Sequence, residues 1–306
     1  MTRLLYVLFA LGALVLSGVA YVNYHADLER ARFNFLLESK ARSERVALQA
    51  EITMRQIHQG LRTIARLPGI SRLPESSLDG DTEATAQEIY NALTANVAIS
   101  SLSVIEADHP DRPVFVADRV LRGAQPSSGH HGLGRPALRL VAAQLSWFQE
   151  NTPRLNPNWD LDYPALTGPG VSLGNEPDGR DQAVVYSVPF YDRQGKVAGC
   201  VSAIILSKVL SETISPGFYG LTSPRHGFSV PSETISHGPR QARYSDWLAS
   251  GKTPTELIYS EVIPLQFPDR TAEWGLWAAR PNEDFWDRPE VQAAWLLALF
   301  QFTALA

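Results

Sequence analysis

Aromatic and charged residues that could bind a small molecule gather in one stretch, residues 151–181, which shows no helix or strand periodicity. A loop of about 30 residues inside a compact domain is usually functional or disordered, and the aromatic residues Trp159 and Tyr163 count against disorder. Aromatic side chains offer rigid apolar area to a ligand, and a few polar groups fix its orientation. The strand that follows adds two more candidates. The predicted ligand-binding residues are Trp159, Asp160, Tyr163, Arg180, Asp181, Tyr186 and Ser187.

Arg180 has the chemistry to hold a carboxylate-bearing ligand, because its guanidinium group donates two parallel hydrogen bonds. A structural alternative stays open for each of these residues. The aromatic rings would then only fasten the loop, and Arg180 and Asp181 would be solvated.

Other reactive groups are few. Cys200 is the single cysteine; it lies in an apolar run, which predicts a small buried residue and not a reactive thiol. His130 and His131 are adjacent, with no Cys, Asp or Glu close by, so we predict no metal site. The chain has no glycine-rich phosphate loop and no H-E-x-x-H motif. We expect no cofactor and no catalysis within these residues.

Composition places the chain among globular proteins. Of its 306 residues 44% are hydrophobic and 19% are charged, which is too apolar for a disordered chain. The net charge is −5 and no basic stripe is visible, so nucleic acid is not an expected partner.

The chain begins with an apolar run, residues 4–24, that carries no charge. It is long enough to cross a hydrocarbon core of roughly 30 Å and predicts a membrane helix. The alternative is a cleaved signal peptide with Gly18-Val19-Ala20 near the cut. Under either interpretation the following residues are expected to be exported.

One long helix is predicted for residues 27–67, which lack proline and end in Leu67-Pro68-Gly69. An apolar seam along it could pack on the protein's own sheet or on a second copy. The seam consists of Ala47, Ala50, Met54, Ile57, Leu61 and Ile64.

The residues after this helix predict a sheet organised around one hairpin, residues 182–210. Val184, Tyr186 and Val188 alternate with Val185 and Ser187, as in a strand. The tetrapeptide Asp192-Arg193-Gln194-Gly195 provides turn residues, and an apolar strand follows it. The other predicted elements are helices at 82–96, 136–149, 207–214 and 244–250, strands at 101–106, 114–118, 227–231, 234–236, 257–265 and 274–279, and loops at 123–134 and 151–181.

The last segment, residues 291–306, is uncharged; Trp286 lies shortly before it and Trp295 near its start. It predicts the start of a second membrane helix that is cut short before the ~20 residues needed to span a bilayer. We therefore expect a further output domain beyond it.

This order of elements resembles the Cache family, the PAS-like extracytoplasmic sensors of bacterial receptors. The resemblance rests on LRTIARLPGI, IYNALTANVAISSLSVIEA and above all YSVPFYDRQGKVAGCVSAIILSKVL, with GFSVPSETISHG and WGLWAARP in a smaller second module. It implies an α+β fold of the double Cache type. The implied domains are a membrane helix at 1–25, a long helix at 26–68, a sensor module at 69–215, a small PAS-like module at 216–287, and a second membrane helix from 288.

The resemblance also implies a function. Such a region recognises a small extracellular molecule. It signals through a second membrane helix to a histidine kinase, a diguanylate cyclase or a chemoreceptor domain. Members commonly act as homodimers in the bacterial inner membrane. Two alternatives stay open: a singly anchored periplasmic binding or scaffold protein, and an exported hydrolase with an unrecognised site.

One branch of that family binds amino acids through an arginine, a tryptophan, tyrosines and an aspartate near the end of the late strand. At the matching positions this chain has Pro157, Trp159, Asn175 and Ile204. A desolvated ammonium group needs a carboxylate partner, and Ile204 cannot provide one. We predict that the ligand is not a free α-amino acid held in that manner.

Overall fold

The computed structural model describes residues 2–73, 80–95, 99–118, 123–125, 135–156, 163–168, 183–206, 219–223, 228–231, 257–269 and 271–305. The chain divides into two compact units. The first unit comprises Met1–Arg45, Ser245–Glu261 and Ala278–Ala306, and the second comprises Val46–Tyr244 and Val262–Trp277.

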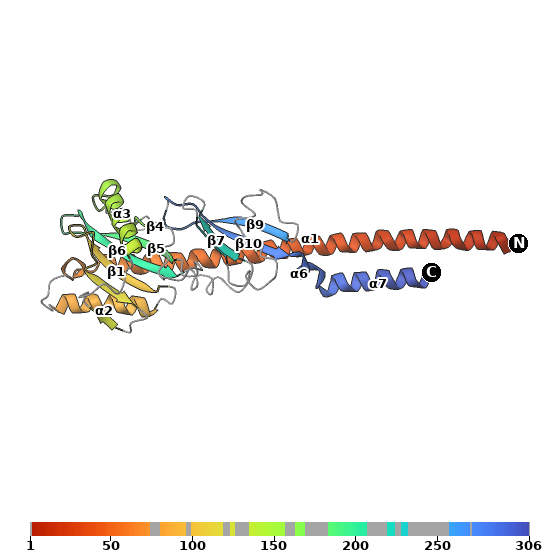
Figure 1. The fold of residues 1–306 in the computed structure, drawn as a ribbon, viewed down its shortest axis with the longest axis horizontal. Helices are drawn as coiled ribbons and strands as arrows, with labels where there is room; N and C mark the ends of the chain where they lie inside the picture. Colours follow the sequence, from red (N-terminus) through yellow and green to blue (C-terminus); the bar gives the residue numbers. More distant parts are fainter. Residues whose placement is uncertain are drawn as a thin grey trace. The chain divides into compact units, whose positions relative to one another are not determined.

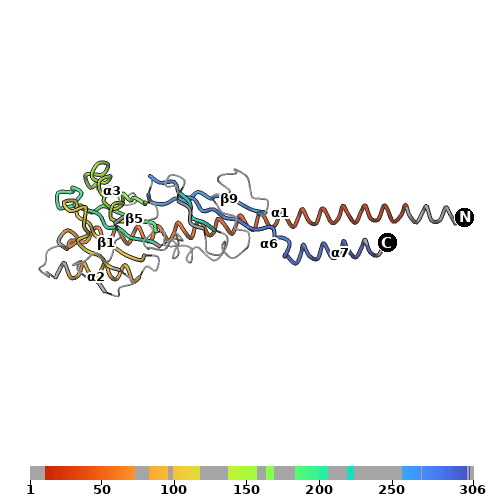
Figure 2. Tube along the Cα trace, in the orientation of Figure 1, coloured from red at the N-terminus to blue at the C-terminus, as the bar shows by residue number. Residues whose placement is uncertain are grey.

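Helix α1 runs from Thr2 to Ala65 as one continuous helix of 64 residues (Figures 1 and 2). The absence of proline and the many Ala, Leu, Glu and Arg residues explain why it does not break. It ends where predicted, before Leu67-Pro68-Gly69, and the short 3-10 helix Ile70–Arg72 follows.

No helix in the described part of the chain combines the length and the apolar character that a membrane span requires. The two predicted membrane helices therefore stay predictions.

The second unit is built on a six-stranded sheet with the order β3-β2-β1-β6-β5-β4, in which neighbouring strands are antiparallel. Its strands are β1 Ser101–Glu106, β2 Phe115–Asp118, β3 Gly123–Gln125, β4 Leu166–Gly168, β5 Ala183–Tyr191 and β6 Val197–Leu206. The predicted loops 123–134 and 151–181 are thus corrected, because β3 and β4 lie in them.

The β5–β6 hairpin confirms the turn that the sequence predicts. The Asp192 carboxylate accepts hydrogen bonds from the backbone N–H groups of Gln194 at 2.8 Å and Lys196 at 2.9 Å. Gly195 has φ of 75°, the left-handed conformation that glycine adopts at low cost.

Helices cover both faces of this sheet. On one face lies α3, Arg135–Asn151, which buries Val141 and Leu145 against β5 and β6 (Figure 1). On the other face lies α1, which contacts Tyr186 of β5 through His58. Helix α2, Gly80–Ala95, packs on β1 and β2. The six seam residues of α1 are all buried within the single chain, so the seam packs on the protein's own fold.

A second sheet has four strands in the order β8-β7-β10-β9. They are β7 Tyr219–Ser223, β8 Phe228–Pro231, β9 Leu257–Leu265 and β10 Trp274–Pro281, followed by α6 Asn282–Trp286 and α7 Pro289–Leu305. The predicted helices at 207–214 and 244–250 and the strand at 234–236 lie outside the described residues.

The predicted α+β class, with antiparallel sheets and a long N-terminal helix, is confirmed. The five domain boundaries stay a prediction.

Candidate functional site

Three serines form a row across the six-stranded sheet. In the register of the strands Ser103 of β1 lies opposite Ser202 of β6, and Ser202 lies opposite Ser187 of β5. Directly opposed residues of antiparallel strands point to the same face. The serine row, Ser103, Ser202 and Ser187, therefore points to one face, and it is almost completely buried there.

Gln144 of α3 forms a hydrogen bond with Ser187. The serine row therefore lies on the sheet face that α3 covers. The Ser187 hydroxyl donates to Gln144 Oε1 at 2.6 Å and lies 2.7 Å from the Ser202 hydroxyl. Because Ser187 has one proton and donates it to Gln144, its contact with Ser202 must be one that it accepts. The hydrogen bonds thus run in one direction, from Ser202 through Ser187 to Gln144.

Three buried polar atoms at this face have no hydrogen-bond partner in the described structure: Ser101 Oγ, Ser103 Oγ and Gln144 Nε2. Ser101 is two residues before Ser103 on β1 and so points to the same face. Burying a donor without a partner costs about 1–3 kcal/mol, and buried polar groups in native proteins are nearly always paired. Their shared position makes this face of the sheet the candidate site for a bound molecule or for ordered water.

Apolar side chains surround this polar group. Ile105, Val185 and Ile204 from the sheet and Val141 and Leu145 from α3 belong to one buried cluster. An apolar wall with few polar groups is the usual composition of a small-molecule site.

Cys200 lies in the same cluster and is fully buried. Burial raises the pKa of its thiol to about 12, against a smaller opposing effect of the Ser202 hydroxyl. A thiol of such high pKa is not a nucleophile at neutral pH. The predicted burial of this cysteine is confirmed.

Tyr186 lies on the opposite face from Ser187 and points toward α1. Its hydroxyl is 3.0 Å from His58 Nδ1, and both side chains are buried. Burial, with a smaller contribution from Arg62, lowers the pKa of His58 to about 4. The structure therefore separates Tyr186 from Ser187, although both are predicted ligand contacts.

The lowered pKa of His58 predicts that the folded protein loses stability in acid. The unfolded chain takes up a proton on this ring near pH 6.5, but the folded chain takes it up only near pH 4. Stability from this group is therefore fully present above pH 6.5 and falls as the pH drops toward 4. We expect the free energy of unfolding to fall by about 2–3 kcal/mol between pH 7 and pH 4.5 on account of this group.

Urea unfolding at pH 7 and pH 4.5 measures this loss. His58→Gln cannot take up a proton at this position. The variant therefore keeps the loss of stability in acid that the carboxylates cause and lacks the part that His58 causes. An equal acid loss in both proteins would contradict the assignment to His58.

Tyr163 fastens the chain ahead of β4. Its hydroxyl donates to the Pro189 carbonyl oxygen of β5 at 2.7 Å. The guanidinium groups of Arg62 and Arg66 lie 5.8 and 5.3 Å from the centre of its ring, within the range of a cation–π contact. These contacts match the structural alternative that the sequence left open for the aromatic residues.

Trp159, Asp160, Arg180 and Asp181 lie outside the described residues, so their part in a ligand site stays a prediction. His130 and His131 lie outside them as well.

The sequence-based list misses Gln144, Ser101, Ser103, Ser202 and His58. A signal for the serines exists, because each is a polar residue inside a strand of otherwise apolar residues on the same face. Gln144 carries a similar signal, since it falls between Val141 and Phe148 on the apolar side of α3.

The chain also contains one G-x-S-x-G pattern, Gly170 to Gly174, outside the described residues. In hydrolases this pattern forms a turn between a strand and a helix. Here Pro177-Asp178-Gly179 follows within a few residues, a sequence that does not favour the helix such a turn requires. We assign no nucleophile to Ser172.

Comparison of the sequence with protein-family models finds no matching family. Comparison with curated proteins finds no matching relative either.

Solved structures do match. A domain described as belonging to a sensory box/GGDEF family protein of Vibrio parahaemolyticus has a TM-score of 0.55 at 11% identity, covering 85% of this chain and 99% of that one. The extracellular domain of a protein described as the histidine kinase vpHK1S-Z8 has a TM-score of 0.56 at 11% identity, covering 85% and 95%. The fold is that of these sensory domains. The resemblance to Cache sensors is thereby confirmed as a resemblance of fold.

Proposed function

We propose that this chain is the extracytoplasmic small-molecule sensor region of a bacterial membrane signalling protein, of the histidine kinase, diguanylate cyclase or chemoreceptor type. The observation that carries the proposal is the group of three unpartnered polar atoms buried on the α3 face of the sheet. The fold supports recognition, not catalysis, because the matched structures are sensory domains.

The polar groups of the site define the ligand class. Gln144 Nε2 offers two donors, and the hydroxyls of Ser101 and Ser103 can donate or accept. A carboxylate or carbonyl oxygen would accept from the amide, in keeping with the predicted carboxylate-bearing ligand. Ile204, which stands where amino-acid sensors have an aspartate, lies in the apolar cluster beside this group. A free α-amino acid would leave its ammonium group without a carboxylate from these residues.

The proposed membrane attachment is supported by apolar side chains of the first unit that face solvent. Among the described residues of α1, Leu14 is 74% exposed, and on α7 Phe300 is 74% exposed. Within residues 11–22 of α1 and 295–300 of α7, the other exposed large apolar side chains are Leu11, Val15, Leu16, Val19, Tyr21, Val22, Trp295, Leu296, Leu297 and Leu299. Contiguous apolar surface of this kind marks a membrane or protein contact. The predicted homodimer stays a prediction.

Ligand binding is tested by replacing Gln144 with leucine, which keeps the size of the side chain and removes its amide. A thermal shift screen of the purified chain against carboxylates, amides, sugars and purines first identifies a ligand. We then expect Gln144→Leu to weaken the affinity by about tenfold or more, since one or two hydrogen bonds are lost.

Ser146→Ala is the matched control, because Ser146 is exposed on the same helix and its hydroxyl bonds only to the Ala142 carbonyl oxygen. The Ser146→Ala variant should bind the ligand with the same affinity as the unchanged chain. A ligand that binds Gln144→Leu with full affinity would place the site elsewhere and refute the proposal.

A further inference from the structure

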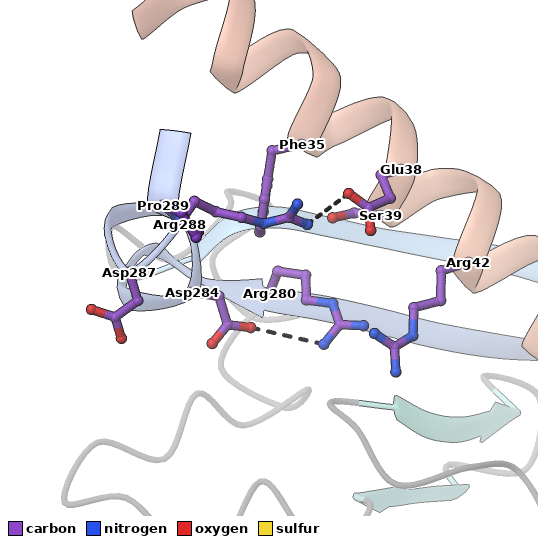
Figure 3. Close-up of a pocket in the computed structure, with 9 residues that line it drawn as sticks. All are labelled: Phe35, Glu38, Ser39, Arg42, Arg280, Asp284, Asp287, Arg288 and Pro289. Carbon is purple, nitrogen blue, oxygen red and sulfur yellow. Dashed lines mark hydrogen bonds and ion pairs between the residues drawn. The ribbon is translucent and has the colours of Figure 1, made fainter. Parts of the chain in front are cut away.

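The cavity of about 290 Å³ in the first unit is lined by charged residues that include two ion pairs (Figure 3). Arg288 Nη2 donates to Glu38 Oε2 at 2.6 Å, and Arg280 Nη1 lies 3.8 Å from Asp284 Oδ2. These pairs already engage charges that a ligand would otherwise contact. The buried atoms without partners at the serine row therefore offer a ligand more than this cavity does.

The side-chain amide of Gln144 has two different ends, and its contact with Ser187 distinguishes them. The distance from Ser187 Oγ to the amide is 2.6 Å. Hydrogen bonds from a hydroxyl to an oxygen are about 2.5–3.0 Å long, whereas bonds from an N–H group to an oxygen are about 2.7–3.2 Å long. The distance therefore fits a bond from the Ser187 hydroxyl to Oε1 and not a bond from Nε2 to Ser187.

Ser202 supports this orientation of the amide. Its hydroxyl lies 2.7 Å from Ser187 Oγ and 3.8 Å from Cys200 Sγ. If the amide were turned round, Nε2 would donate to Ser187 and Ser187 would donate to Ser202. The Ser202 proton would then have only the sulfur, a weak acceptor, among the hydrogen-bond neighbours that the structure describes. In the observed orientation oxygen atoms accept both hydroxyl protons, and Nε2 is left for a ligand.

We propose that Ser187 is a positioning residue that makes this site select ligands with a hydrogen-bond acceptor, such as a carbonyl or carboxyl oxygen, over ligands that have only a donor. The proposal rests on the proposed function, since it concerns the same site. Gln144 Nε2 carries two protons and no lone pair, so only an acceptor satisfies it. A ligand without an acceptor leaves this buried donor unpaired and is rejected for that reason.

The hydroxyls of Ser101 and Ser103 do not provide this selectivity. Each can donate or accept, because a hydroxyl group rotates to suit its partner. The choice between acceptor and donor therefore depends on Gln144, and the orientation of Gln144 depends on Ser187.

Two uncharged five-membered rings test this selectivity. Cyclopentanone has a carbonyl acceptor and no donor, and pyrrole has an N–H donor and no acceptor atom. Because neither ring is charged, the cost of burying a charge does not decide which one binds. Saturation-transfer NMR titrations of the full chain measure both dissociation constants. We expect cyclopentanone to bind about fivefold more tightly than pyrrole.

Ser187→Ala removes the hydroxyl that holds Oε1, so that the amide can turn either end toward a ligand. We expect the two rings to bind this variant with nearly equal affinity. Ser202→Ala is the matched control, because Ser202 is just as buried and loses the same atom, while Ser187 keeps its bond to Gln144. Ser202→Ala should keep the preference for cyclopentanone. The same preference in Ser187→Ala would overturn the proposal.

The unchanged chain provides a second measurement that does not depend on the folding of Ser187→Ala. The side-chain amide signals of Gln144 in the NMR spectrum of the isotope-labelled chain are identified by their absence in Gln144→Leu. We expect cyclopentanone to shift these signals and pyrrole to leave them in place. Bound cyclopentanone that left the Gln144 signals unmoved would contradict the proposed role of the amide.

Failure of this proposal can be told apart from failure of the sensor proposal. If neither ring binds, ordered water alone satisfies the unpartnered atoms and the selectivity proposed here is wrong. The ligand screen and Gln144→Leu decide the sensor proposal separately. If Gln144→Leu weakens binding of cyclopentanone but Ser187→Ala keeps the preference, the site stands and the role of Ser187 does not.

Discussion

Replacing Asp269 with alanine is expected to lower the free energy of unfolding by about 4 kcal/mol, because several buried hydrogen bonds to a charged group are lost together. Asp269 is 2% exposed. Its Oδ2 accepts from the backbone N–H and the hydroxyl of Thr167, both at 2.5 Å. Its Oδ1 accepts from the N–H and the hydroxyl of Thr271 at 2.8 and 2.7 Å. Urea unfolding of the two proteins at pH 7 measures the difference.

Asp269→Asn should lower the free energy of unfolding by less than Asp269→Ala does, because asparagine keeps one acceptor oxygen and the shape of the side chain. Glu273→Ala is the matched control, since Glu273 is an exposed acid nearby in sequence, and its stability should change by no more than about 0.5 kcal/mol. If Asp269→Ala were as stable as Glu273→Ala, the hydrogen bonds around Asp269 would make no net contribution to stability.

Within the second unit, the Asp269 contacts also connect β4 with the first residue of β10. Thr167 belongs to β4, at the edge of the six-stranded sheet, and Trp274 Nε1 of β10 donates to the Thr167 hydroxyl at 2.9 Å. A ligand that shifted β4 would therefore act directly on β10. Such switching requires the ligand to bind one arrangement better than the other.

Replacing Gly199 with alanine is expected to lower the free energy of unfolding by about 3 kcal/mol, because no space exists for a methyl group. Gly199 lies in β6, opposite Glu106 of β1 and Phe190 of β5. A Cβ atom there would collide with the carbonyl oxygen of Ile105 and with the buried ring of Phe190. The backbone carbonyl cannot move without disturbing the β1–β6 pairing. Thermal and urea unfolding both measure the effect.

Gly60→Ala is the matched control for this prediction. Gly60 lies inside α1, and a Cβ atom there would meet no atom within 4 Å. Alanine favours a helix over glycine by about 1 kcal/mol, so this variant should be more stable than the unchanged chain. Equal effects of the two Gly→Ala changes would show that steric contact at Gly199 is not limiting.

The parts of the fold with strong local signals could be predicted from the sequence. The β5–β6 hairpin combines alternation over several residues with turn chemistry at Asp192 and Gly195, and the structure confirms both strands. Strands β3 and β4 have three residues each, which is too short for a period to show. Their positions are determined by pairing with β2 and β5, a tertiary effect that no local pattern contains.

The candidate site was harder to predict for a related reason. Ser103, Ser187 and Ser202 lie far apart in the sequence and meet only through the strand register. Gln144 joins them only because α3 covers that face. The sequence correctly places Tyr186 and Ser187 on opposite faces of a strand, but it cannot tell which face holds the ligand.

The buried thiol of Cys200 can serve as a chemical probe of local unfolding around β6. Iodoacetamide reacts with a thiolate, and the folded protein offers it none while β6 stays within the sheet. The alkylation rate therefore reports how often the centre of the sheet separates, with no label and no engineered residue. Since Cys200 neighbours Ser202, any molecule held at the serine row would slow that reaction in proportion to its occupancy.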